Sequence, residues 1–93
     1  MTTERIPVRS TQFKKDYKLA VRRYGARIGP ELAVVVTALC HGEALPARVK
    51  DHPLVSWSPP VRECHLRPDL LLVYRVTPDV VELVRLGSHS DIF

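Results

Sequence analysis

The chain has 93 residues, a formal net charge of +4 at pH 7 and an apolar fraction of 45%. This length has room for a single core, so we expect one domain over residues 1–93. No apolar run approaches the roughly 20 residues of a membrane-spanning helix. The first ten residues lack the apolar stretch of a signal peptide, so we expect a cytoplasmic protein without membrane contacts. The positive charge favours an acidic partner, either a nucleic acid or an acidic protein.

The N-terminal third predicts a short strand and an amphipathic helix. Residues 5–9 read as a strand, in which Pro7 is tolerated near the start or at a sheet edge. Ser10 offers a capping oxygen to the helix that follows, and Gly25 is well placed to end it in a left-handed conformation. Apolar residues recur at helical spacing between these two limits. They are Phe13, Tyr17, Ala20, Val21 and Tyr24.

A second helix is predicted to begin near Pro30 and to stop around the sequence HGEALP. Pro30 suits a first helical turn, and Glu31 interacts favourably with the positive end of the helix dipole. Gly42 and Pro46 oppose continuation. Residues 47–60 contain three prolines and show no periodicity, so we expect a long and functional loop. The buried face of the second helix is predicted to be Leu32, Val35, Val36 and Leu39.

The C-terminal third has the periodicity of strands. Residues 61–67 alternate, residues 70–76 are apolar on both faces, and residues 80–88 form a third apolar run. Turn sequences separate the three, which predicts an antiparallel meander. With the two helices on one face, the prediction is an α+β fold of order β-α-α-β-β-β with a small antiparallel sheet. Cys40 and Cys64 form no CxxC motif and are interpreted as small buried hydrophobic residues.

Three of the four histidines are predicted to gather at one edge of this sheet. In a meander the first and third strands run parallel, so their C-terminal ends lie on the same edge. Those ends carry His65 and His89, and Asp69 follows in the adjacent turn. His52 comes from the long loop. His41 lies at the end of the second helix, where a cation is favourable.

Imidazoles, a carboxylate and arginines suit RNA cleavage by internal transfer, in which a 2′-OH attacks the adjacent phosphorus. The reaction needs a base, an acid for the departing 5′-oxygen, and cations for the phosphorane charge. Histidine fills either proton role and arginine the electrostatic one. Two alternatives stay open from the residues alone. One is a metal site, although no compact HxH or HxxxH pair is present; the other is a merely basic surface.

Four blocks of the sequence resemble the YafQ-type toxins of the RelE superfamily. They are KDHPL, a following tryptophan, RECHLRPDLLLVYRV and RLGSHSDIF, and the similarity runs from STQFKKDYKLA to Phe93. The resemblance implies a type II toxin–antitoxin endoribonuclease that cleaves mRNA in the ribosomal decoding site without a metal or other cofactor. It also implies a cognate antitoxin that wraps and blocks the toxin. The alternative is a toxin of this fold that binds, without cleavage, to the translation machinery or to a DNA enzyme.

Carried over by motif, the resemblance implies an active site whose acid and base roles are left open. Lys50, Arg67 and Arg85 are our additional candidates for RNA phosphate contacts. Trp57 is interpreted as a packing residue, and prolines replace a glycine common near it in relatives, which stiffens the approach to the sheet. The implied active-site residues are His52, His65, Asp69, His89 and Phe93.

Overall fold

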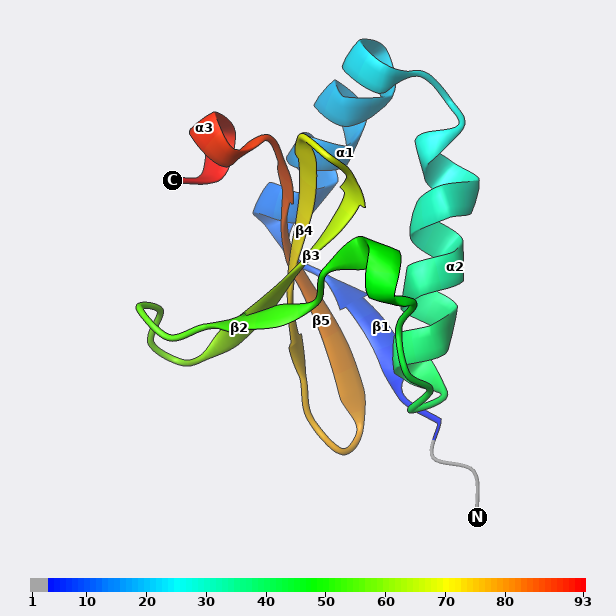
Figure 1. Ribbon diagram of the computed structural model, residues 1–93, viewed down its shortest axis with the longest axis vertical. Coiled ribbons are helices and arrows are strands. Elements are labelled where there is room, and N and C mark those ends of the chain that lie inside the picture. Colours follow the sequence, from blue (N-terminus) through cyan, green and yellow to red (C-terminus); the bar gives the residue numbers. More distant parts are fainter. Residues whose placement is uncertain (1–3) are drawn as a thin grey trace.

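The computed structural model describes residues 4–93, so the first three residues of the predicted domain lie outside the described part. A helical hairpin follows a short first strand, and the remaining strands come after it (Figure 1). None of the helices within residues 4–93 is long and apolar enough to cross a membrane. The elements are β1 (Ile6–Arg9), α1 (Thr11–Tyr24), α2 (Ile28–Cys40), the 3₁₀ turn η1 (Ala47–Val49), β2 (His52–Leu54), β3 (Val61–Arg67), β4 (Leu70–Val76), β5 (Val80–Gly87) and α3 (His89–Ile92).

The strands form one five-stranded sheet in the order β1-β5-β4-β3-β2. The predicted meander of β3, β4 and β5 is confirmed, with antiparallel pairing throughout. The α+β fold with two helices on a small sheet is confirmed too, and the sheet has more strands than predicted. β1 pairs in parallel with β5, so the sheet is mixed. β2, which we expected to be loop, adds a fifth strand antiparallel to β3.

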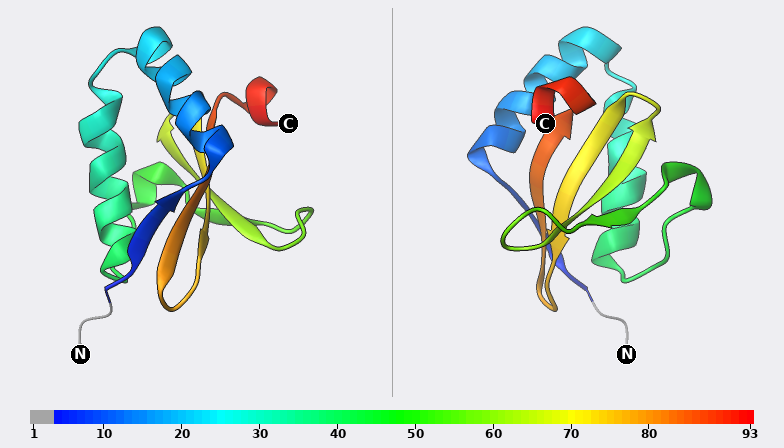
Figure 2. Two further views of the ribbon diagram at one scale, coloured as in Figure 1. Left: turned by 180° about the vertical axis from the view of Figure 1, so that it is seen from behind. Right: turned by 60° about the vertical axis from the view of Figure 1, so that its left-hand side comes forward.

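Helices α1 and α2 cover one face of the sheet, while β2 and the loop after it cross the other face (Figure 2). Ser10 caps α1 as predicted, since its hydroxyl oxygen accepts from the Phe13 backbone N–H at 2.9 Å. Gly25 follows the helix with φ of +91°, a conformation that favours glycine. The apolar side chains of both helices pack on alternate residues of the strands, including Cys64 and Leu72.

Both cysteines are buried and free, as the sequence predicted. Burial raises the pKa of the Cys64 thiol to about 12, and the Asp51 and Glu63 carboxylates act in the same direction. The thiol is therefore uncharged at neutral pH and behaves as a small apolar group. Cys64 and Leu66 belong to the helix-side core, which leaves His65 on the opposite face of β3.

The edge of β5 beyond its pairing with β1 is completed by a side chain. β1 pairs with β5 as far as Leu83, and the Asp16 carboxylate of α1 then accepts from the Leu86 backbone N–H at 3.0 Å. Asp16 also accepts two hydrogen bonds from Arg85, at 2.8 and 3.3 Å. A buried carboxylate thus takes the place of a neighbouring strand and fixes the end of β5, from which the C-terminal turn departs.

Candidate active site

The C-terminal ends of β3 and β5 lie at the same edge of the sheet, as predicted. Arg67, the last residue of β3, pairs with Leu70 of β4, and Gly87, the last residue of β5, pairs with Leu71. The two strands therefore end side by side on either side of β4. His65 lies just before the first of these ends, and His89 lies just after the second.

His52 and His65 come together on the open face, with their ring centroids 6.5 Å apart. The contact exists because His52 is the first residue of β2 and pairs directly with Glu63 of β3. His65 lies two residues further along the same strand, so its side chain projects from the same face as that of Glu63. Histidines of two neighbouring strands are thereby placed next to each other.

Both ring nitrogens of His52 are engaged. Nδ1 lies 2.9 Å from the Lys50 carbonyl oxygen, and Nε2 lies 3.0 Å from Oε2 of Glu63. The carbonyl can only accept a hydrogen bond, so Nδ1 carries its proton. A second proton must lie between Nε2 and the carboxyl group, because two bare acceptors repel. His52 and Glu63 are therefore joined by a hydrogen bond on the open face.

Glu63 is the site residue that motif transfer missed. Its side chain is only 4% exposed, and it belongs to the few buried charged residues of the described chain. A signal was present, because strand alternation already placed Glu63 and His65 on one face. A carboxylate at a buried strand position needs a hydrogen-bonding or ionic partner. The sequence did not reveal that the partner would come from β2.

The segment before His52 is held by a polar network beneath it. The Asp51 carboxylate accepts from the Tyr74 hydroxyl and, at 2.9 Å, from Nη2 of Arg62. Burial raises the pKa of Tyr74, and its hydrogen bond to Asp51 raises it further, so the hydroxyl stays a donor. Lys50 adopts a left-handed conformation with φ of +50°. These contacts set the direction from which His52 enters the site.

His65 faces a groove of about 310 Å³ along the part of β3 that β2 leaves unpaired. Its Nδ1 lies 3.4 Å from the Pro68 carbonyl oxygen, which can only accept, so Nδ1 carries the proton there. Nε2 of His65 has no hydrogen-bond partner within residues 4–93. The groove is lined by Arg48, Lys50, His65, Leu66, Arg67 and Pro68.

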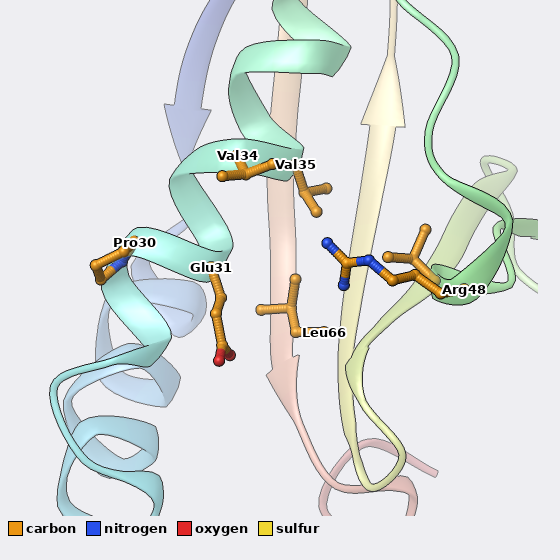
Figure 3. A pocket seen from close by; sticks show the side chains of 7 residues that line it. Pro30, Glu31, Val34, Val35, Arg48 and Leu66 are labelled. Atoms are coloured by element: carbon orange, nitrogen blue, oxygen red, sulfur yellow. The ribbon is translucent and has the colours of Figure 1, made fainter.

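A second, more apolar pocket of about 220 Å³ adjoins this groove between α2, η1 and β3 (Figure 3). Arg48 and Leu66 line both hollows. Figure 3 shows the Arg48 side chain extending into the pocket from η1, while Glu31 descends from α2 on the other side. The groove at His65 therefore continues from a basic region into an apolar one.

The C-terminal residues form a turn of helix rather than an extended tail. The rings of His89 and Phe93 lie 4.8 Å apart between centroids. Phe93 also meets Trp57 edge to face, at 6.0 Å and 76°. Trp57 belongs to the loop between β2 and β3, so this contact joins the C-terminal turn to the loop that follows β2. The packing role predicted for Trp57 agrees with this contact.

The remaining predicted residues lie near the site with partners of their own. Asp69 accepts from the Tyr24 hydroxyl of α1 at 3.2 Å. Arg67 makes two hydrogen bonds to Glu31, at 3.0 and 3.2 Å, and Arg85 is paired with Asp16. Lys50 lines the groove and forms no ion pair within residues 4–93. In the same range, no group of three potential ligands among histidine, cysteine and carboxylate side chains is placed to hold a metal ion.

Comparison with known proteins assigns the chain to a family. Residues 5–93 match the model of the family described as the bacterial toxin of type II toxin–antitoxin systems, YafQ. The mRNA interferase toxin YafQ of Escherichia coli strain B is 38% identical over 85 residues, which cover 90% of each chain. A putative YafQ toxin of Haemophilus influenzae is 33% identical over 87 residues, covering 88% of this chain and 85% of the relative.

Solved structures show the same fold. YafQ in the E. coli DinJ–YafQ toxin–antitoxin complex superposes with a TM-score of 0.83 at 36% identity, covering 97% of this chain and 98% of that one. A metal-bound toxin from Helicobacter pylori has a TM-score of 0.86 at 40% identity over the full length of both chains. Fold and site thus define a small toxin of a type II toxin–antitoxin system. The chain belongs to the YafQ family.

Proposed function

We propose that this toxin is a ribosome-dependent endoribonuclease that cleaves mRNA by metal-free general acid–base transfer. The arrangement of His52, Glu63 and His65 is the observation that carries the proposal. It puts an imidazole that holds a proton 6.5 Å from one whose Nε2 is free, on an open face beside a groove lined by cations. The E. coli relative named an mRNA interferase supports the same activity.

The geometry also suggests how proton transfer is divided. His65, with a proton on Nδ1 and a lone pair on Nε2, suits the base that takes the proton of the 2′-OH. The His52–Glu63 pair already holds a proton and suits the acid that protonates the departing 5′-oxygen. His89 follows β5, across β4 from His65, and is proposed to contact the same phosphate, with Phe93 against a base and Asp69 at the margin. Each proton-transfer group contributes roughly 10²–10⁴ in rate.

Cations are needed for the charge that develops on the phosphorane. Lys50 is the candidate that is free of ion pairs within the described chain. Arg67 and Arg85 can serve only by exchanging Glu31 and Asp16 for a phosphate, or by acting through those pairs. We therefore rank Lys50 first among the three proposed phosphate contacts.

The proposed partners are the ribosome with its mRNA and a cognate antitoxin. The antitoxin is supported by the DinJ–YafQ complex, in which a relative of 36% identity is bound to its own. Cytoplasmic location follows from the proposed substrate, because ribosomes translate there.

The proposal is tested by expressing the chain in a bacterial host without an antitoxin. We expect growth arrest and mRNA cut in frame with codons, and we expect His89→Ala to relieve both. His41→Ala is the matched control, because His41 pairs at 3.5 Å with Glu43 at the far end of α2 and should remain toxic. Equal toxicity of His89→Ala and the unchanged chain would remove His89 from catalysis.

The same experiment separates the alternatives. Growth arrest with intact mRNA would indicate a toxin that acts by binding alone. Cleavage by the purified toxin on ribosomes should persist in excess chelator. Loss of cleavage on chelation, with recovery on adding a divalent metal, would contradict the metal-free mechanism.

A further inference from the structure

The C-terminal turn α3 is joined to the body of the protein through Asp91. One carboxylate oxygen of Asp91 accepts from the Ser88 backbone N–H at 3.0 Å and from Nη1 of Arg23 at 3.1 Å. In return, the Asp91 backbone N–H donates to the Ser88 hydroxyl oxygen at 3.2 Å. The two bonds between Ser88 and Asp91 form a reciprocal capping box within the turn. The bond from Arg23 ties that turn to α1.

The turn has little else to hold it. It is four residues long, and none of its residues is buried. Isolated helices of this length are not stable in water, because nucleation is unfavourable and few hydrogen bonds form. Phe93, which follows the turn, remains 50% exposed despite its contact with Trp57. The capping box is therefore a large part of what keeps these residues ordered.

Gly87 leaves room for this arrangement. A Cβ at position 87 would lie 3.2 Å from Cβ of Asp91 and 3.3 Å from its Oδ2. That is closer than most Cβ contacts allow, so a larger residue would push the carboxylate away from Ser88. Gly87 thus provides space for the Asp91 side chain, Ser88 caps the turn, and Asp91 accepts the reciprocal hydrogen bond.

The turn also sets the position of the His89 side chain relative to that of Phe93, both of which are proposed active-site residues. His89 follows Ser88 directly, and the Phe93 backbone N–H donates to the His89 carbonyl oxygen at 2.9 Å. This bond places the two rings 4.8 Å apart. If the turn unwinds, His89 and Phe93 lose both their spacing and their contact with Trp57.

We infer that Asp91 is a positioning residue, which orders the C-terminal turn and so presents His89 and Phe93 to the RNA. The inference rests on the proposed ribonuclease function. Exposed ion pairs contribute little by themselves, so the bond from Arg23 is secondary and the capping box with Ser88 is primary. We expect the largest loss of ordering and activity for Asp91→Ala, a smaller loss for Ser88→Ala, and the smallest for Arg23→Gln.

The test uses two independent readouts on the purified full-length toxin. The first is cleavage of ribosome-bound mRNA, resolved into kcat and KM. A displacement of about 1 Å costs up to about 10²-fold in rate, so Asp91→Ala should lower kcat at least about tenfold and leave KM nearly unchanged. Asp91→Glu keeps the S-x-x-E form of the capping box and should restore most of the loss.

The second readout needs no activity. Trp57 is the only tryptophan in the chain, so its fluorescence reports the contact with Phe93. Asp91→Ala should shift the emission to longer wavelength and increase quenching by acrylamide, as Phe93→Ala should also do. Arg22→Gln is the control for Arg23→Gln, since it removes a neighbouring exposed arginine of α1 that has no contact with the turn within the described chain.

The two readouts separate this inference from the proposed function. A Trp57 change without loss of kcat, or loss of kcat without a Trp57 change, would overturn the positioning role. No change in either would overturn it as well. If the unchanged toxin cleaves no RNA, the proposed function fails and the link to catalysis fails with it. The fluorescence would still show whether Asp91 orders the turn.

Discussion

At the scale of single residues, the His52–Glu63 pair decides how a proton is held on the open face. Nδ1 of His52 donates to the Lys50 carbonyl oxygen, and Nε2 on the other side of the ring faces the buried carboxyl group of Glu63. His65 differs because its Nε2 has no partner within residues 4–93. Two histidines of one site are thus distinguished by their neighbours, in the way that environments separate acids from bases in enzymes.

Replacement of Glu63 by glutamine tests this distinction. Glutamine has nearly the same shape but donates an N–H to Nε2, so His52 no longer shares a proton with a carboxyl group. We expect kcat to fall by about 10²-fold with little change in melting temperature. Glu43→Gln is the matched control, because Glu43 faces His41 in a similar but exposed pair. An equal loss of kcat in both variants would contradict the assignment.

At the scale of elements, a carboxylate on α1 substitutes for a strand beside β5. Burial alone would raise the pKa of Asp16, but hydrogen bonds from Arg85, Gln12 and the Leu86 N–H outweigh it and lower the pKa. A pKa lowered by folding means that the charged form stabilises the native state. This contribution is present above about pH 4 and is lost as the pH falls through the lowered value.

Asp16→Asn should therefore destabilise the protein in a way that depends on pH. We expect a loss of about 2 kcal/mol in the free energy of unfolding at pH 7, since Arg85 loses its charged partner. The loss should shrink below pH 4, where the unchanged protein also begins to lose this contribution. Urea unfolding at pH 7 and pH 3 measures both. A difference that grows on acidification would show the opposite linkage.

The C-terminal turn is an element whose removal separates activity from stability. Because α3 buries no residue, deletion of residues 89–93 should lower the melting temperature by less than about 8 °C. Toxicity should be abolished, since His89 and Phe93 are removed together. Circular dichroism melting and growth after expression are the measurements. Loss of folding on this deletion would make the turn structural.

At the scale of the whole molecule, the net charge of +4 and the basic groove favour binding to a polyanion. Affinity for single-stranded RNA should fall linearly with salt on logarithmic axes, with a slope of about 0.7 for each phosphate neutralised. The ion pairs of Arg67 and Arg85 reduce the charge available for this purpose. Lys50 and Arg48 line the groove and form no ion pair within residues 4–93, and Lys50 is the one of the three proposed contacts that is left for a phosphate.

Lys50→Ala is expected to lower the magnitude of that slope by about 0.7. The measurement is RNA binding between 50 and 200 mM salt in a His89→Ala background, which prevents cleavage. Arg22→Gln serves as the control for a lost positive charge on the helical side. An unchanged slope for Lys50→Ala would exclude a phosphate contact at that residue.

Much of the local structure was predictable from sequence. The cap at Ser10, the stop at Gly25 and the alternation of β3 are all found where they were expected, because each depends on neighbours within a few residues. β2 was not predictable, since three residues cannot show a period. Its hydrogen bonds exist only because β3 offers an edge. The proposed site residues His52, His65, Asp69 and His89 came from sequence motifs, but Glu63 did not.

The sequence by itself determined the helical hairpin, the three-stranded meander, the burial of both cysteines and the membership in a toxin family. These depend on short-range periodicity, capping and motif spacing. Only the tertiary structure decided that β1 runs parallel to β5, that His52 pairs with Glu63, and that Phe93 meets Trp57. The physical reason is that these contacts join segments far apart along the chain, and their geometry arises only when the sheet has formed.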